Sequence, residues 1–254
     1  MTMTSASVSQ SNDVSHEFVP VVSSTQKDAV KDLTLSISNN PCPNLRDIQS
    51  HQLSLRYGII WPAKLSWSIF RYLEEYITYM PESQTQVKVF NKWHKIPRKQ
   101  VAFGDQGLSY KFSSTEVPAA DWDPVLKSIC DWLNRSFEGA KYNFVLINRY
   151  ADGDDYIGEH RDDEKDLMHG SSIASISLGQ EREFVLRHQT SLKRKHSITS
   201  TTTTPKNMNI SLQHGALLIM QPPTNQYWYH SLPKRKAAKN PRINLTFRRM
   251  KFTM

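Results

Sequence analysis

The chain has 254 residues and a mass of 29.3 kDa, and 38% of its residues are hydrophobic. This is enough apolar material for one folded domain with a tail. A mean hydropathy of -0.56 and the lack of a long apolar run exclude a membrane-spanning helix. Cys42 and Cys130 are too few for a disulfide scaffold or a multi-cysteine metal cluster, and they favour a reducing, intracellular compartment.

The net charge of +8 is unevenly distributed along the chain. Residues 187–254 contain 13 Lys and Arg and no Asp or Glu, whereas residues 1–186 contain 19 basic and 24 acidic residues. A second acid-free stretch, 83–104, carries five basic residues. This asymmetry favours a surface that binds a polyanion such as nucleic acid, although a solvated basic face without a partner gives the same composition.

The N-terminal part of the chain predicts a tail followed by helices. Residues 1–50 are expected to be a disordered Ser/Thr-rich tail, because the first 40 contain 13 Ser and Thr and show no hydrophobic period. The folded domain then spans 51–254. A first helix follows Pro62, with apolar residues at helical spacing through Met80, and a second follows Asp123, a capping residue, with Pro124 in its first turn.

From residue 141 onward the hydrophobic period changes to two, which predicts strands. Five segments show it: 142–150, 172–178, 182–187, 216–220 and 242–250. Helices followed by a run of strands predict an α+β fold with an antiparallel sandwich or barrel. The Ser/Thr/Lys-rich stretch 189–209 is expected to be a flexible insertion between two of these strands.

The last predicted strand has two chemically different faces. Ile243, Leu245 and Phe247 alternate with a second set, which comprises Arg242, Asn244, Thr246 and Arg248. On an open surface the polar face would simply be solvated. Inside a barrel the two arginines would have to meet anions, because an unpaired buried charge is too costly.

A candidate metal site begins at His160 and Asp162. In an extended chain these two side chains project to the same side, and a second His from elsewhere would complete a two-His, one-carboxylate triad. Such a triad leaves one face of an iron ion open for a cosubstrate and oxygen. The candidates for the distal ligand are His188, His196, His214 and His230. We favour His230, because it lies in a plausible strand and His188 and His196 border the flexible insertion.

An open-faced iron site needs an organic acid to activate oxygen, and 2-oxoglutarate is such an acid. Its carboxylates would need cationic partners, and Arg binds carboxylates in bidentate fashion. Arg242 and Arg248 on one strand, with Asn148 and Tyr150 on another, could form that pocket.

Several ordered motifs resemble the AlkB-type Fe(II)/2-oxoglutarate dioxygenases. They are Asn148-Arg-Tyr150, the segment 152–164, His230-Ser-Leu-Pro233 and the segment 241–248. Upstream, segments 89–100 and 103–113 resemble a nuclear animal member of the family that repairs duplex DNA. The resemblance implies a double-stranded β-helix (jelly-roll) core with supporting N-terminal helices and a nucleotide-recognition lid over 85–120.

The resemblance also implies roles for individual residues. His160, Asp162 and His230 would bind Fe(II), while 2-oxoglutarate would be held by Arg242 and Arg248 with Asn148, Tyr150 and Asn244. Phe112 and His160 would sandwich a flipped base, Tyr110 and Ser113 would line its pocket, Asp163 and Glu164 would bind its polar edge, and Phe90 would fill the gap in the stack. Arg98, Lys234, Arg235 and Lys236 would contact the nucleic acid, and the last three also form a candidate nuclear localisation signal.

The implied reaction is oxidative removal of alkyl groups from 1-methyladenine and 3-methylcytosine in DNA, preferably duplex. Molecular oxygen and 2-oxoglutarate are consumed and formaldehyde is released. The expected protein is a nuclear monomer that does not bind membranes. The N-terminal region shows no short basic–aromatic–aliphatic motif, so a replication-clamp partner is not predicted.

Three alternatives remain at this stage. The substrate could be single-stranded DNA or RNA. Only the family resemblance of Phe90 and of the basic residues 234–236 favours a duplex. The chain could bind nucleic acid without catalysis. A protein or small-molecule hydroxylase on the same core is a third reading, but it does not explain the basic excess after residue 187.

Overall fold

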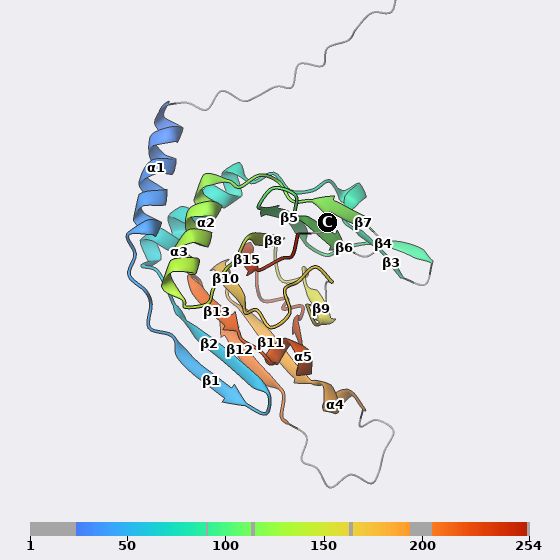
Figure 1. The fold of residues 1–254 in the computed structure, drawn as a ribbon. Helices are drawn as coiled ribbons and strands as arrows, with labels where there is room; N and C mark the ends of the chain where they lie inside the picture. Colours follow the sequence, from blue (N-terminus) through green and yellow to red (C-terminus); the bar gives the residue numbers. More distant parts are fainter. Residues whose placement is uncertain (1–23, 90, 113–114, 163–164, 194–204, 253–254) are drawn as a thin grey trace, which may run out of the picture.

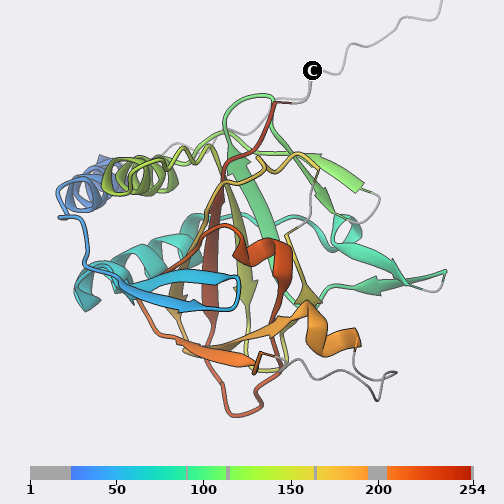
Figure 2. The same ribbon diagram turned by 60° about the horizontal axis from the view of Figure 1, so that its bottom comes forward.

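The computed structural model describes residues 24–89, 91–112, 115–162, 165–193 and 205–252. Its centre consists of two sheets in which every neighbouring pair of strands is antiparallel (Figures 1 and 2). The major sheet has seven strands in the spatial order β1 (Arg46–Ser50), β2 (Leu53–Ile59), β13 (Ala216–Met220), β10 (Ile173–Gly179), β15 (Arg242–Arg248), β8 (Phe144–Tyr150) and β5 (Lys99–Gly104). The minor sheet has four strands in the order β12 (Met208–Leu212), β11 (Arg182–His188), β14 (Trp228–Leu232) and β9 (Ile157–His160).

The inner faces of the two sheets enclose one cavity, because residues of both sheets line it. Apart from the adjacent pairs β1–β2 and β11–β12, neighbouring strands are not consecutive in the sequence, so each sheet is assembled from distant parts of the chain. This arrangement is the α+β fold with a jelly-roll core that the sequence predicted.

Two helices cover the outer face of the major sheet. α2 (Ala63–Tyr76) and α3 (Pro124–Ser136) contribute buried Ile69, Leu73 and Ile129 to a core shared with β8, β10 and β15. The cap of α3 is as predicted, since Asp123 Oδ1 accepts hydrogen bonds from the first two free amides of the helix at 2.9 and 3.1 Å.

The predicted N-terminal tail is wrong from residue 24 onward. Residues Ser24–Ser38 form α1, which packs against α3 and buries Ile37 completely, and β1 also falls inside the predicted tail. Only Val30, Leu33 and Ile37 of α1 contact the core; their spacing is helical, but three apolar residues in a Ser/Thr-rich segment are a weak signal. Packing against α3, rather than the helix's own sequence, stabilises it. Residues 1–23 lie outside the described residues.

The insertion predicted over 189–209 is ordered at both ends. It begins with the short helix α4 (Gln189–Lys193), and β12 starts at Met208. Residues 194–204 lie outside the described part of the chain. A further short helix, α5 (Thr224–Tyr227), precedes β14.

The segment predicted as a lid, 85–120, is divided between the core and two small hairpins. β5 belongs to the major sheet, whereas β3 (Gln86–Val89) pairs with β4 (Lys92–Lys95) and β6 (Ser109–Phe112) pairs with β7 (Thr115–Pro118). A 3-10 turn, η1 (Glu82–Gln84), leads into β3. Both hairpins extend from one end of the major sheet (Figure 1). Among the described residues, no helix is long and apolar enough to span a membrane.

Candidate active site

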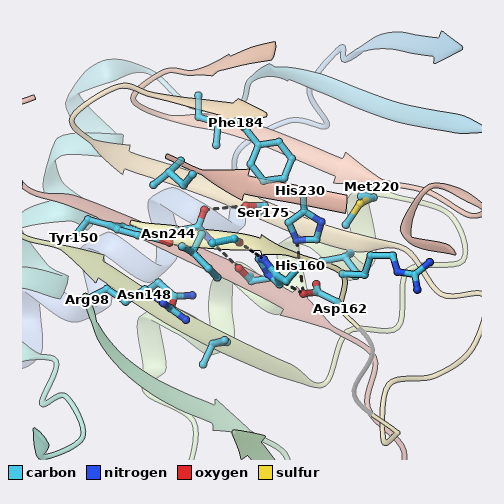
Figure 3. A pocket seen from close by; sticks show the side chains of 18 of the residues that line it. Arg98, Asn148, Tyr150, His160, Asp162, Ser175, Phe184, Met220, His230 and Asn244 are labelled. Carbon is cyan, nitrogen blue, oxygen red and sulfur yellow. Dashed lines mark hydrogen bonds and ion pairs between the residues drawn. The ribbon is translucent and has the colours of Figure 1, made fainter. Parts of the chain in front are cut away.

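Three metal-ligand side chains meet on the inner face of the minor sheet (Figure 3). His230, in the middle of β14, pairs across the sheet with His160, the last residue of β9. Cross-strand partners share one face, so both imidazoles project to the same side. Asp162 follows two residues later, and its Oδ1 lies 3.7 Å from His160 Nε2 and 3.8 Å from His230 Nε2. The structure therefore brings the predicted triad together.

The geometry and charge state of these residues fit a divalent iron ion. Bonds from a metal to His nitrogen or carboxylate oxygen are about 2.0–2.2 Å long, so two ligands of one ion lie within about 4 Å. Both spacings meet this limit. Burial lowers the pKa of His230 to about 3, so its imidazole is neutral and offers a lone pair. Burial opposes ionisation of Asp162, but the Arg248 guanidinium beside it favours the carboxylate and lowers the pKa of the carboxyl.

The other histidines considered as ligands lie elsewhere. The Nδ1 of His214 accepts a hydrogen bond from the Gly179 amide, and its ring stacks on Trp67 at 4.0 Å between centroids. His188 bonds through its two ring nitrogens to Thr190 and Gln52. His196 lies outside the described residues. Neither His188 nor His214 joins the metal-ligand group, which consists of His160, Asp162 and His230 in the described residues.

A row of polar side chains crosses the inner face of the major sheet opposite the triad. Register pairs Ser177 of β10 with Asn244 of β15, Asn244 with Asn148 of β8, and Asn148 with Gln100 of β5. We call these four residues the polar row. Asn148 and Asn244 line the central cavity of about 430 Å³, together with Tyr150, Arg242, Thr246, Arg248 and the triad. The polar face of β15 is therefore buried in the fold and is not a solvated surface.

Arg242 is a buried cation in this cavity. Its side chain is 1% exposed, and its Nη2 donates to Ser177 Oγ at 2.9 Å and to Asn244 Oδ1 at 2.8 Å. Its guanidinium lies 5.2 Å from the centroid of the Tyr150 ring. Burial lowers its pKa to about 10, which still leaves it protonated at neutral pH. Among the described residues no carboxylate forms an ion pair with Arg242, so an acidic ligand would offset its burial.

Arg248 occupies the other end of the same strand face, next to the triad. Its Nη2 lies 2.9 Å from Asp162 Oδ1, and both side chains are almost completely buried. The guanidinium therefore supports the ionised carboxylate and faces the space beside the metal ligands.

Two residues of the predicted substrate set also line the cavity. Arg98 and Tyr110 line the cavity, and Arg98 Nε donates to Asn148 Oδ1 at 2.8 Å (Figure 3). Arg98 is thus bonded to a residue predicted to bind the cosubstrate. Lys234, Arg235 and Lys236 lie on an exposed loop after β14.

Other predicted substrate residues cannot be placed in this way. Phe90, Ser113, Asp163 and Glu164 lie outside the described residues. Phe112 is the last residue of β6, and only its backbone is described.

Three residues around the cavity were not predicted from the sequence. Ser175 and Ser177 on β10 bond to Asn244 and Arg242 at 2.9 Å. Their alternation with Ala174 and Ile176 in a predicted strand was a usable signal. Phe184 on β11 packs against the His230 ring at 5.3 Å between centroids, and nothing in its sequence context distinguishes it from a core residue.

The fold and the site define a class of enzyme. A jelly roll with a two-His, one-carboxylate triad beside a cationic cavity suits iron and an acidic cosubstrate. The chain belongs to the 2OG-Fe(II) oxygenase superfamily, whose family model matches residues 55–248.

The chain is also similar to individual named proteins, which are more specific than the superfamily. The chain is 44% identical over 208 residues to the DNA oxidative demethylase ALKBH2 of Mus musculus, covering 82% of this chain and 84% of that protein. The Homo sapiens protein of the same name is 44% identical over 83% of this chain and 78% of that protein. The Homo sapiens alpha-ketoglutarate-dependent dioxygenase alkB homolog 3 is 33% identical, covering 61% and 52% of the two chains.

A solved structure, "The structure of OsALKBH1", matches with a TM-score of 0.52 at 14% identity and covers 79% of this chain and 100% of that one. At this identity the match supports the fold alone. The resemblance to AlkB-type dioxygenases that the motifs indicated is confirmed by the family match and by the relatives.

Proposed function

We propose that this chain is a DNA oxidative demethylase, which removes alkyl groups from base nitrogens in an iron- and 2-oxoglutarate-dependent reaction. The observation that carries the proposal is the cavity in which the metal-ligand triad faces the buried Arg242 cation. The named relatives at 44% identity supply the substrate class, alkylated DNA.

His160, Asp162 and His230 would hold Fe(II), which with oxygen and 2-oxoglutarate supplies the oxidising chemistry. Arg242 would bind one carboxylate of 2-oxoglutarate, because it is the buried cation at the end of the cavity. Ser177 and Asn244 fix the direction of its guanidinium by accepting hydrogen bonds at 2.9 and 2.8 Å. Tyr150 forms the wall beside it.

Arg248 would contribute to both the cosubstrate and the metal. It holds Asp162 ionised, which keeps this ligand competent for a cation. From the same position it faces the space where the second carboxylate of 2-oxoglutarate would lie beside the metal. Asn148 and Asn244 would complete the polar wall, and Arg98 fixes the amide of Asn148.

We propose that a flipped base enters between the metal-ligand triad and the lid hairpins, which are the strand pairs β3–β4 and β6–β7. Tyr110 would line its pocket, with Phe112, Ser113, Asp163 and Glu164 assigned by their motif positions. An N-alkylated base such as 1-methyladenine or 3-methylcytosine has a blocked pairing edge, so its extrusion costs less than that of an intact base. These lesions are cationic, which suits the two acidic residues.

A preference for duplex DNA, a nuclear location and a monomeric state belong to the same proposal. Lys234, Arg235 and Lys236 are exposed cations on one loop, suited to a phosphate backbone. Phe90 would fill the gap left by the flipped base.

The test is an assay of the unmodified chain with 1-methyladenine or 3-methylcytosine in matched duplex and single-stranded oligonucleotides. We expect formaldehyde and succinate in a 1:1 ratio, only when Fe(II) and 2-oxoglutarate are both present, and faster turnover on the duplex. Faster turnover on a single strand or on RNA would replace the duplex assignment. Binding of DNA without succinate release would contradict an enzyme altogether.

A further inference from the structure

Arg182, the first residue of β11, has a buried side chain that none of the roles above uses. It is 1% exposed, and its guanidinium donates three hydrogen bonds to backbone carbonyls. Nη1 donates to Asp152 O at 2.9 Å, and Nη2 donates to Asp155 O and Pro233 O, both at 2.8 Å. The first two carbonyls belong to the loop between β8 and β9, and the third begins the loop between β14 and β15.

Burying the Arg182 guanidinium costs free energy, which its hydrogen bonds have to offset. Burial lowers the pKa of Arg182, and among the described residues no carboxylate forms an ion pair with it. An apolar side chain of similar size could fill the space without that desolvation. An apolar side chain cannot form hydrogen bonds to two separate loops at once. A guanidinium can, because its N–H donors point in fixed and different directions.

The same two loops also touch through their backbones. The Gly153 amide donates to Ala238 O and the Arg235 amide donates to Gly153 O, both at 2.8 Å. A Cβ built on Gly153 would lie 1.8 Å from Arg235 O, so no residue with a side chain fits there without moving the loops apart. We call residues 151–156 and 233–241 the joined loops.

The joined loops carry an exposed cationic surface and are connected to the lid. Lys234, Arg235, Lys236 and Lys239 are exposed, and Lys234 Nζ lies 5.2 Å from the centroid of the Tyr156 ring. The Tyr156 amide donates to Pro97 O at 3.1 Å, one residue before the cavity residue Arg98. The backbone of the loop that carries these cations is thus held in place relative to the cavity through Arg182 and Gly153.

We propose that Arg182 is a positioning residue for duplex DNA: by bonding the joined loops together it holds Lys234, Arg235 and Lys236 in place to bind the strand opposite the lesion. The proposal rests on the proposed function and names how one part of the substrate is held. A cationic loop that is already ordered binds phosphates without the entropy cost of ordering it on contact. A single strand that carries the lesion has no opposite strand, so its turnover does not depend on this arrangement.

The experiment compares Arg182→Met and Gly153→Ala with the unmodified chain. We expect each variant to raise KM for a methylated duplex by about five-fold or more, while kcat/KM on a short methylated single strand and KM for 2-oxoglutarate change by less than about two-fold. Both variants disrupt the contact between the joined loops, one by removing the hydrogen bonds of Arg182 and the other by adding a side chain at Gly153. Gly153→Ala therefore tests the proposal if Arg182→Met does not fold. Hydrogen exchange at the Gly153 and Arg235 amides should become faster in both.

Arg149→Met is the matched control. Arg149 is a largely buried arginine on β8 whose guanidinium binds Glu74 of α2 at 2.7 Å and does not bond the two joined loops to each other. Its loss should lower thermal stability and leave the ratio of duplex to single-strand activity unchanged. If Arg182→Met behaves in the same way, Arg182 is purely structural and the proposal is wrong.

A double-mutant cycle separates positioning from a general loss of stability. In a background of Lys234→Ala, Arg235→Ala and Lys236→Ala, the change Arg182→Met should have no further effect on the duplex, because the cations that it positions are gone. An additive effect would overturn the proposal. Failure of the proposed function is a different outcome: the unmodified chain would then show no 2-oxoglutarate-dependent demethylation of either DNA.

Discussion

The inner face of the major sheet and the lid hairpins are built in opposite ways. β8 and β15 each pair with a strand on both sides, and nearly all their side chains are buried. The lid strands β3, β4, β6 and β7 form two separate two-stranded hairpins, and all four side chains of β4 are exposed. The first region is buried inside the protein, whereas the second exposes side chains that, under the proposed function, a bound substrate would contact. Substitutions in the first should therefore affect every substrate equally, and substitutions in the second should discriminate between substrates.

The largest effect is expected at the metal ligands. His230→Ala should abolish turnover on both duplex and single-stranded DNA, because a two-ligand site cannot hold iron in the facial arrangement. Succinate release and Fe(II) binding measure this. His214→Ala, which removes an imidazole outside the site, should leave both intact, and residual turnover in His230→Ala would disprove the ligand assignment.

A large but partial effect is expected at Arg248. Arg248→Ala should raise the 2-oxoglutarate concentration needed for half-maximal rate by about ten- to a hundred-fold, since a charge-assisted hydrogen bond contributes about 1.5–3 kcal/mol. The factor should be the same on duplex and single strand. Arg249→Ala is the control, because Arg249 is not among the residues that line the cavity. An unchanged 2-oxoglutarate dependence would remove Arg248 from the cosubstrate site.

A smaller, selective effect is expected at Phe90. Phe90→Ala should lower the ratio of duplex to single-strand activity by about five-fold or more, since stacking between a base and an aromatic ring is worth about 1–3 kcal/mol and matters only where a stack exists. Kinetics on matched oligonucleotides and thermal melting of the protein decide the point. Equal losses on both substrates together with a lower Tm would identify Phe90 as core packing.

The smallest effect is expected at single lysines of the basic loop. Lys236→Ala should weaken duplex binding regardless of sequence and make the slope of log K against log salt less steep by about 0.9. Lys141→Ala, which removes an exposed lysine from the segment before β8, provides the comparison. If both variants change the slope equally, the loop has no special contact with DNA.

The sequence predicted best what alternation or helical spacing encodes. The apolar positions of β15 and the cap at Asp123 follow from local rules, and the structure has both. The structure also brings His230, and not His214, beside His160 and Asp162, because a strand places a side chain on a definite face. The pairing of Arg242 and Arg248 with the carboxylates of 2-oxoglutarate required that their strand line the interior of a barrel, and the structure buries both side chains.

The rest depends on contacts between distant residues. α1 is held by α3, so its own sequence did not indicate a helix. Strands β9 and β14 are short, and their pairing of His160 with His230 could not be read from either segment alone. The three carbonyls that surround Arg182 come from two loops, and no motif marks a backbone oxygen as the partner of a buried arginine.

The polar row limits where residues can be inserted into this fold or deleted from it. Its members come from four strands, and they share the inner face of the major sheet only because the registers of β10, β15, β8 and β5 agree. Shifting the register of β15 by one residue would turn Arg242, Asn244 and Arg248 together to the outer face, which the helices cover, and bring Ile243 and Leu245 to the cavity side. An insertion within the strand would reverse the faces of all residues on one side of it. Insertions and deletions should therefore be confined to the connections between strands, and descendants of this sequence can diverge in loop length while the strands keep their number of residues.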